Sequence, residues 1–216
     1  MNHILYTTLI IALSGSSLFF TKAQSQPKWD EIKIEQANTA KEIKYLSHEE
    51  KEIVYYTNLA RIDGPLFAST FLEEYLKKNN IRSNKWIASL KKDLENSPSL
   101  SPLIPQKDLS GIARQHAEKS GKTGRTGHFD FKERTKDVMK KYNGIGENCN
   151  YGTANGLLIV ILLLIDEGVE NLGHRKNMLN SDYQYTGVSI ERHKKYGFNG
   201  VIVYGGKKRQ EFSSID

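Results

Sequence analysis

An uninterrupted apolar run, LLIVILLLI over residues 157–165, constrains the fold of this chain more than any other feature. A run of this length falls far short of the roughly 20 residues that a helix needs to cross a bilayer. It therefore has to lie inside a protein core. Together with its flanks, the segment 154–166 is long for a strand. We expect a buried helix that protein covers on nearly all sides.

Apolar residues recur at helical spacing before this run, and strand-like pieces follow it. The first helix begins at a capping box, Ser47 with Glu50, and ends at Asp63-Gly64-Pro65. Further helical patterns cover 67–76, 86–94, 109–117 and 131–142, and a proline-broken loop covers 96–106. Segments 186–191 and 200–204 are typical of strands joined by a polar turn. This order indicates an α+β fold with helices packed on a small sheet.

The beginning of the chain has the pattern of an export signal. Residues 4–20 are apolar and small, and Thr21 and Ala23 stand at the two small-residue positions before a cut. We expect a signal peptide at 1–23 and a secreted or periplasmic protein, with an uncleaved membrane anchor as the alternative. A polar segment at 24–44, which could serve as a linker, one domain at 45–206 and a basic tail at 207–216 would follow.

Cysteine content and charge exclude several classes. One cysteine among 216 residues cannot form an internal disulfide or a four-cysteine zinc site. The formal net charge is +6, and removal of residues 1–23 would take away one lysine and leave +5. Acidic residues are interleaved with the basic clusters and no aromatic platform separates them, which favours a solvated surface over a nucleic-acid site. Weak attraction to an anionic membrane surface stays open.

Four groups are the candidates for chemistry. His128 and His174 each follow a glycine in a loop-like context, Glu147 stands in a glycine-flanked turn, and the acidic pair Asp166-Glu167 ends the buried run. Two neutral imidazoles can bind a borderline divalent metal such as zinc, and a carboxylate beside them can orient the ligands or act as a base. We expect the other histidines of the mature chain to be solvated at positions 48 and 193 and packed at position 116.

Several short motifs, in this order, resemble the CAP superfamily of cysteine-rich secretory, antigen and pathogenesis-related proteins. The chain is most similar to the bacterial SCP-like extracellular members, over roughly residues 50–205. The motifs are Asn58-Leu59-Ala60-Arg61, Leu109 with Ala113 and Ala117, Gly127-His128, Gly146-Glu147-Asn148, Gly173-His174-Arg175 with Asn177, and Gly187-Val188.

The resemblance implies a three-layer α-β-α sandwich, with a mainly antiparallel sheet and a cleft lined by two histidines and two acids. By position, the histidines are His128 and His174 and the first acid is Glu147. For the second acid we favour Asp166 over Glu167, although the animal pattern has a glutamate after a tryptophan and this chain has leucines and isoleucines there. Asn58 and Arg61 match family positions that are structural.

Two functional hypotheses follow. In the first, the cleft binds a divalent metal, zinc being the best match, and a ligand that is a lipid or a partner's surface. In the second, the protein is a metal-assisted hydrolase in which His128 and His174 hold the metal and Glu147 is the general base. Cys149 as a nucleophile, and His174, Asn177 and His193 as a nuclease motif, are less favoured readings. The sequence leaves the oligomeric state open.

Overall fold

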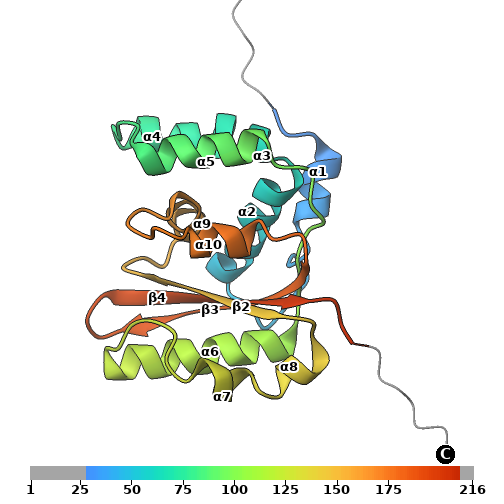
Figure 1. The fold of residues 1–216 in the computed structure, drawn as a ribbon, viewed down its shortest axis with the longest axis vertical. Coiled ribbons are helices and arrows are strands. Elements are labelled where there is room, and N and C mark those ends of the chain that lie inside the picture. Colours follow the sequence, from blue (N-terminus) through green and yellow to red (C-terminus); the bar gives the residue numbers. More distant parts are fainter. Residues whose placement is uncertain (1–27, 210–216) are drawn as a thin grey trace, which may run out of the picture.

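A four-stranded sheet separates two layers of helices, which confirms the predicted α+β sandwich (Figure 1). The structure is a computed structural model that describes residues 28–209. The strand order is β1-β3-β4-β2. Strands β3 (Tyr183–His193) and β4 (Gly197–Gly206) form a hairpin, and β2 (Ile145–Tyr151) pairs antiparallel with β4. Strand β1 (Ile104–Pro105) is parallel to β3. The sheet is therefore mainly antiparallel, and β2 forms one of its edges.

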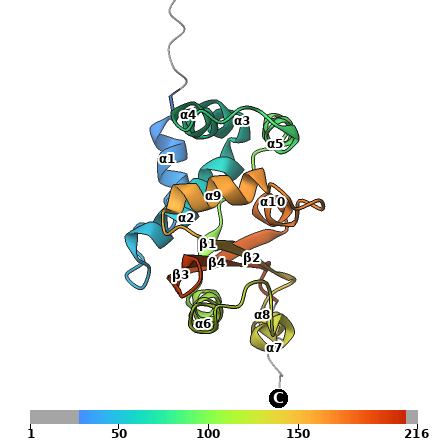
Figure 2. The same cartoon turned by 90° about the vertical axis from the view of Figure 1, so that its left-hand side faces the viewer.

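The larger helical layer covers one face of the sheet (Figure 2). Next to the sheet lie α2 (His48–Ile62), α9 (Gly156–Ile165) and α10 (Gly173–Met178), and α1 (Glu31–Ala37) packs against α2. Above them runs a continuous helical stretch of α3 (Gly64–Phe67), a π-helical turn η1 (Ala68–Leu72) and α4 (Glu73–Lys78), beside α5 (Lys85–Glu95). The predicted helices at 47–63, 67–76 and 86–94 are confirmed.

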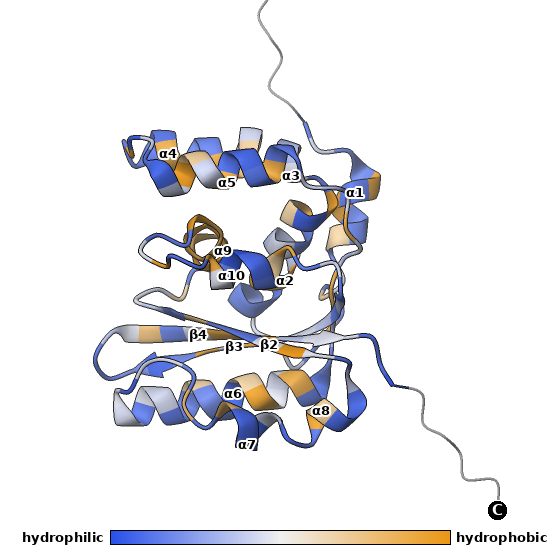
Figure 3. Cartoon of the chain, in the orientation of Figure 1, coloured by the Kyte–Doolittle hydropathy of each residue, from blue (hydrophilic) through white to orange (hydrophobic). Residues whose placement is uncertain are grey.

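The apolar run forms α9, which confirms the buried helix. Figure 3 shows it as an apolar element between the sheet and the outer helices. Ile159, Val160 and Leu164 have no exposed surface. Asn155 caps its N-terminus by accepting a hydrogen bond from the Leu158 backbone. At roughly 1.5–3 kcal/mol for each fully buried large apolar side chain, α9 is a major source of stability.

The second layer, on the other face, consists of α6 (Lys107–Thr123), α7 (Phe131–Thr135) and α8 (Val138–Lys141) (Figure 1). Successive side chains of β4 point to opposite faces of the sheet and pack in both layers. Val201 and Val203 face α6, while Ile202 and Tyr204 belong to the core between the sheet and α9. Helix α6 lies so close to β3 that a Cβ at Gly187 would overlap the backbone of Leu109 and Ser110. Glycine is required there for this close approach.

Two buried polar residues join the first helix to distant segments, as expected for Asn58 and Arg61. The Asn58 amide donates to the carbonyls of Ala37 and Leu103 and accepts from the Leu103 backbone. The Arg61 guanidinium, which is fully buried, donates to four backbone carbonyls. These belong to Ser101, Met178, Asn180 and Tyr183. Because these carbonyls lie in the loop before β1, at the end of α10 and just after it, and at the start of β3, Arg61 links α2 to all of these segments.

Three sequence predictions need correction. The helix expected at 131–142 is two short helices, because the chain bends after Thr135. Residues 145–151, expected to contain a turn, form the edge strand β2. The polar segment at 24–44 is no simple linker where the structure describes it, because it carries α1 and buries Ala37 and Ala40 in the core. The proposed signal peptide and most of the basic tail lie outside the described residues. None of the described helices is both long and apolar enough to span a bilayer.

Candidate functional site

The structure brings His128, Glu147, Asp166 and His174 together around the edge strand β2 as two histidine–carboxylate pairs. His128 Nδ1 lies 3.0 Å from Glu147 Oε1, and His174 Nδ1 lies 2.6 Å from Asp166 Oδ1. The two imidazole rings are 6.5 Å apart between centroids. His128 comes from the loop between α6 and α7, whereas His174 lies in α10 and not in the loop that the sequence predicted. The site therefore combines Glu147 of the sheet with residues from both helical layers.

Asp166 is fixed by the way α9 ends. It is the C-cap residue in the left-handed conformation, with φ 56°, and this turn directs its buried carboxylate at the start of α10. There it accepts from the backbone N–H groups of His174 at 2.9 Å and Arg175 at 3.2 Å, in addition to the imidazole. Arg175 in turn donates to the carbonyls of Leu164 and Ile165. The His174 pair is thus anchored by the end of the apolar helix.

The neighbouring acid, Glu167, points elsewhere. Its side chain is exposed and accepts a hydrogen bond from Asn84 Nδ2 at 3.1 Å. Of the two acids between which the sequence left a choice, Asp166 is the one in contact with His174.

Glu147 is held from several sides and is only 1% exposed. Arg134, on α7, donates to Oε2 at 2.8 Å and to Oε1 at 3.0 Å, and His116 Nε2 lies 3.7 Å from Oε1. Burial alone would raise the pKa of Glu147, but hydrogen bonds from His128 and Arg134 outweigh it and leave the pKa below its ordinary value. Glu147 is therefore a carboxylate at neutral pH, and both of its oxygens are engaged.

The other face of β2 is tied to α10 by amides. Asn148 Nδ2 donates to the His174 carbonyl at 2.9 Å, and Asn177 Nδ2 donates to Asn148 Oδ1 at 2.8 Å. Because side chains alternate along a strand, Glu147 faces the α6–α7 layer and Asn148 faces α10. One strand thus fixes both histidines. Among these supporting residues, sequence reasoning missed Arg134 and His116 as partners of Glu147, since no local motif links either to residue 147.

The arrangement of the two pairs suits a metal ion. With each Nδ1 hydrogen-bonded to a buried carboxylate, each Nε2 carries the free lone pair, which is the tautomer that metal-binding histidines adopt. Side-chain exposure is 47% for His128 and 24% for His174, so both rings are accessible to solvent. Two neutral imidazoles with water completing the coordination are a donor set that zinc accepts. The residues present therefore fit the group.

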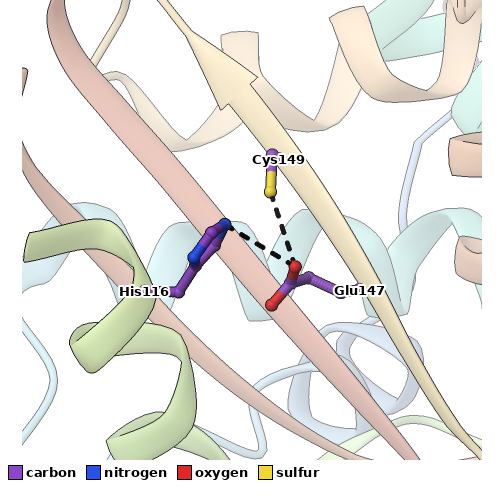
Figure 4. A group of neighbouring side chains, drawn as sticks. All are labelled: His116, Glu147 and Cys149. Atoms are coloured by element: carbon purple, nitrogen blue, oxygen red, sulfur yellow. Dashed lines mark hydrogen bonds and ion pairs between the residues drawn. The ribbon is translucent and has the colours of Figure 1, made fainter. Parts of the chain in front are cut away.

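A second cluster, His116, Glu147 and Cys149, has donor atoms within 4.8 Å of one another (Figure 4). Its chemistry is unfavourable for a cation because Arg134 already neutralises Glu147. Burial raises the pKa of the Cys149 thiol well above its ordinary value, so the sulfur is not a thiolate. Burial also lowers the pKa of His116 and keeps it neutral. This cluster is a packed support for Glu147.

A third group with suitable donor spacing, His48, Glu49 and Glu52, lies at the start of α2. Glu49 Oε2 already accepts a hydrogen bond from the Gly156 backbone at 2.6 Å, which joins α2 to α9. Its carboxylate therefore has a structural role.

The remaining histidines divide between surface and core. His48 is 81% exposed and His116 is fully buried, as predicted. The prediction of a solvated His193 is wrong: its Nδ1 accepts from the Lys195 and Tyr196 backbones, and its Nε2 lies 3.2 Å from the Arg125 carbonyl. Both of its ring nitrogens are occupied by the β3–β4 turn and the α6–α7 loop, which removes the basis of the nuclease reading.

A pocket of about 330 Å³ adjoins the His174 pair. Asp166, Glu167 and His174 line it together with residues 149–151 of β2. The other lining residues are mostly apolar and come from α4, α5, the turn before α5, α9 and the loop after α9; these residues are Tyr75, Ile81, Ile87, Leu162, Leu163, Ile165 and Val169. The pocket therefore combines a few polar groups with a mostly apolar wall.

Most of the chain matches the model of a known protein family. The family model "CAP: Cysteine-rich secretory protein family" matches residues 55–205. No curated protein matches the chain. Among solved structures, an outer surface protein of Borrelia burgdorferi is 19% identical, with a TM-score of 0.43, and the alignment covers 65% of this chain and 96% of that one.

Two further solved structures are similarly distant. An extracellular protein containing a SCP domain from Bacillus anthracis is 15% identical, with a TM-score of 0.47 and coverage of 84% of this chain and 45% of that chain. Venom allergen-like protein 4 of Schistosoma mansoni is 16% identical, with a TM-score of 0.44 and coverage of 76% and 92%.

Proposed function

The chain belongs to the cysteine-rich secretory protein (CAP) family, and on this premise we propose that it binds a divalent metal ion through His128 and His174. Zinc is the ion that best matches two imidazoles in an open site. The observation that carries the proposal is the pairing of each Nδ1 with a buried carboxylate, Glu147 or Asp166. Such pairing fixes the ring orientation and presents Nε2 to an ion.

The same cleft is proposed to bind a ligand in the adjoining pocket. Its wall is mostly apolar and also includes His174, Asp166 and Glu167, so it suits a short apolar group that ends in a polar head. A lipid fits this description better than a flat partner surface does, because the pocket is concave. When bound, a metal ion would act as a Lewis acid toward a polar head that reached it.

Glu147 is proposed to position His128 and not to act as a general base. A base for an attacking water needs a free carboxylate oxygen within reach of that water. Both oxygens of Glu147 are engaged by Arg134 and His128, and the side chain is almost without exposed surface. Binding is therefore the better-supported function, and the hydrolase alternative would need Glu147 to be released.

Export is part of the proposal, in view of the apolar segment at 4–20 and the small residues that follow it. Expression of the full chain in a bacterial host tests it. We expect the protein in the periplasm or medium, cut after Ala23, as read by N-terminal sequencing and mass. Retention in the membrane at full length would contradict cleavage.

Zinc titration of the mature protein by calorimetry tests the metal site. We expect one ion per chain, and we expect loss of binding in His128→Ala and in His174→Ala. The matched control is His48→Ala, which removes an exposed imidazole at a distance from the site. Retained tight binding in the His128→Ala/His174→Ala double variant, with thermal unfolding showing it to be folded, would refute the proposal.

For the ligand, the protein purified from a bacterial host is extracted with organic solvent and analysed by mass spectrometry. We expect a lipid near one per chain, with occupancy reduced in Leu162→Arg, which places a charge in the pocket wall. Turnover of ester, peptide or cell-wall substrates that disappears in a folded Glu147→Gln variant would instead favour the hydrolase.

A further inference from the structure

A second cavity, far more basic than the first, lies at the opposite helical layer. Its volume is about 1260 Å³. It is open to solvent and is lined by the first turn of α6, by the end of α8 with the chain that leads into β2, and by the segment 207–209 that follows β4. None of the four residues of the proposed metal site lines it. We call it the basic pocket.

Of the described residues that line the basic pocket, six carry a positive side chain and one carries a carboxylate. The cations are Lys107, Lys140, Lys141, Lys207, Lys208 and Arg209, and the carboxylate is Asp108. Asp108 is already engaged, because Tyr142 donates to Oδ1 at 3.0 Å and Lys141 Nζ lies 3.2 Å from Oδ2. Lys140 pairs with Asp137, but that pair is exposed and holds the lysine only weakly. The pocket therefore keeps a large positive excess.

The segments that carry these cations are fixed to one another. The Asn143 backbone donates to the Lys207 carbonyl at 2.9 Å, and the Arg209 backbone donates to the Lys141 carbonyl at 2.8 Å. Lys208 Nζ donates to Gln106 Oε1 at 2.9 Å and lies 4.9 Å from the centre of the Tyr185 ring. The positive charges are thus gathered by the fold, since residues 107, 141 and 208 are far apart in the sequence.

We propose that the basic pocket binds a ligand with clustered phosphate groups. Several lysines around one cavity attract dense negative charge, and their separate positions suit more than one phosphate. Among the described residues that line the pocket, none offers an aromatic face on which a nucleobase could stack, because Tyr142, the one aromatic residue of this set, is only 1% exposed. Phosphates are therefore the recognised groups. This site is separate from the proposed metal centre and does not depend on it.

Calorimetric titration with tripolyphosphate tests the proposal. We expect saturable binding that weakens as salt is raised. In the Lys107→Gln/Lys207→Gln variant we expect at least about tenfold weaker binding, since two charge-assisted contacts to phosphate are lost. Neither lysine makes a side-chain hydrogen bond or ion pair within the described residues, so the fold should tolerate the change. The control, Lys77→Gln/Lys78→Gln, removes the same charge from the end of α4.

Vesicles identify the source of the phosphate. The protein is sedimented with phosphatidylcholine vesicles that contain phosphatidylglycerol. If it binds tripolyphosphate but does not sediment with the vesicles, the pocket recognises soluble phosphates. If it binds tripolyphosphate and also sediments with the vesicles, the pocket recognises lipid headgroups as well. Absence of tripolyphosphate binding, or equal weakening in the Lys77→Gln/Lys78→Gln control, would overturn the proposal. His174→Ala should bind tripolyphosphate unchanged, so failure here and failure of the metal site remain distinguishable.

Discussion

Replacing Asp166 by asparagine should weaken zinc binding at His174 by changing which nitrogen of its ring carries the proton. Asp166 Oδ2 accepts the backbone N–H groups of His174 and Arg175, whereas Oδ1 faces His174 Nδ1 at 2.6 Å. In Asp166→Asn the amide oxygen keeps the two backbone donors, and the NH₂ group then faces Nδ1. A ring nitrogen that accepts a hydrogen bond has no proton, so Nε2 is protonated and its lone pair is lost to the metal.

The expected loss of zinc affinity in Asp166→Asn follows from the role of the Asp166 carboxylate in orienting His174. Loss of a carboxylate that orients a metal-binding histidine costs about 10- to 100-fold in affinity, which is about 1.4–2.7 kcal/mol. The cost to folding is smaller, because only the hydrogen bond to the charged group is weakened. We expect about 1 kcal/mol in the free energy of unfolding without metal. The effect on binding should therefore exceed the effect on stability.

Two measurements and one control make the test decisive. Zinc affinity comes from competition with a chelator, and the tautomer of His174 comes from nitrogen NMR of histidine-labelled protein. The control is Glu167→Gln, which makes the same chemical change at the neighbouring exposed acid and should leave both readouts unchanged. An affinity within about twofold of the parent in a folded Asp166→Asn protein, or equal weakening in the control, would refute the reasoning.

Three further predictions concern the interior. Arg61→Met leaves four backbone carbonyls without their donor, so urea denaturation should show that the free energy of unfolding falls by at least about 3 kcal/mol. In the control Arg114→Met, which changes an exposed arginine on α6, the free energy of unfolding should fall by about 0.5 kcal/mol or less. Cys149, whose thiol pKa is raised by burial, should react with a chromogenic disulfide reagent only in denaturant; rapid stoichiometric labelling of native protein would contradict this. Burial raises the pKa of Tyr151 from 10.0 to about 12, so the native state keeps a neutral phenol where the unfolded chain ionises. The contribution of Tyr151 to stability should be constant below pH 10 and fall between pH 10 and 12, so a Tyr151→Phe variant followed by thermal unfolding should show a smaller decline in this window.

The parts of the fold that the sequence could predict are those determined by local chemistry. The capping box of Ser47 and Glu50 is present with both hydrogen bonds, and it starts α2 where expected. The run over 157–165 has no polar face, so burial was its only stable outcome, and it forms α9. These predictions needed only a few neighbouring residues.

Strand β2 could not be predicted in this way. Its sequence, IGENCNY, lacks strict alternation and has a single β-branched residue, and its glycine and asparagines are typical of turns. It is a strand because all seven of its residues pair with β4 and because its polar side chains find partners in both helical layers. Pairing with a strand about 50 residues away in the sequence therefore overrode the local preference.

The same long-range pairing explains why the candidate site was only partly predictable. The order of family motifs pointed to His128, Glu147 and His174, whereas the second acid stayed a choice between Asp166 and Glu167 in which Asp166 was favoured. The residues that support the site could not be predicted. Arg134 reaches Glu147 only because α7 packs over the edge strand, and Asn177 reaches Asn148 only because α10 lies on its other face. A carboxylate and an amide in adjacent positions of one strand necessarily face opposite layers. Strand β2 can therefore hold one histidine from each layer, and a site built in this way forms only when both layers have assembled on the sheet.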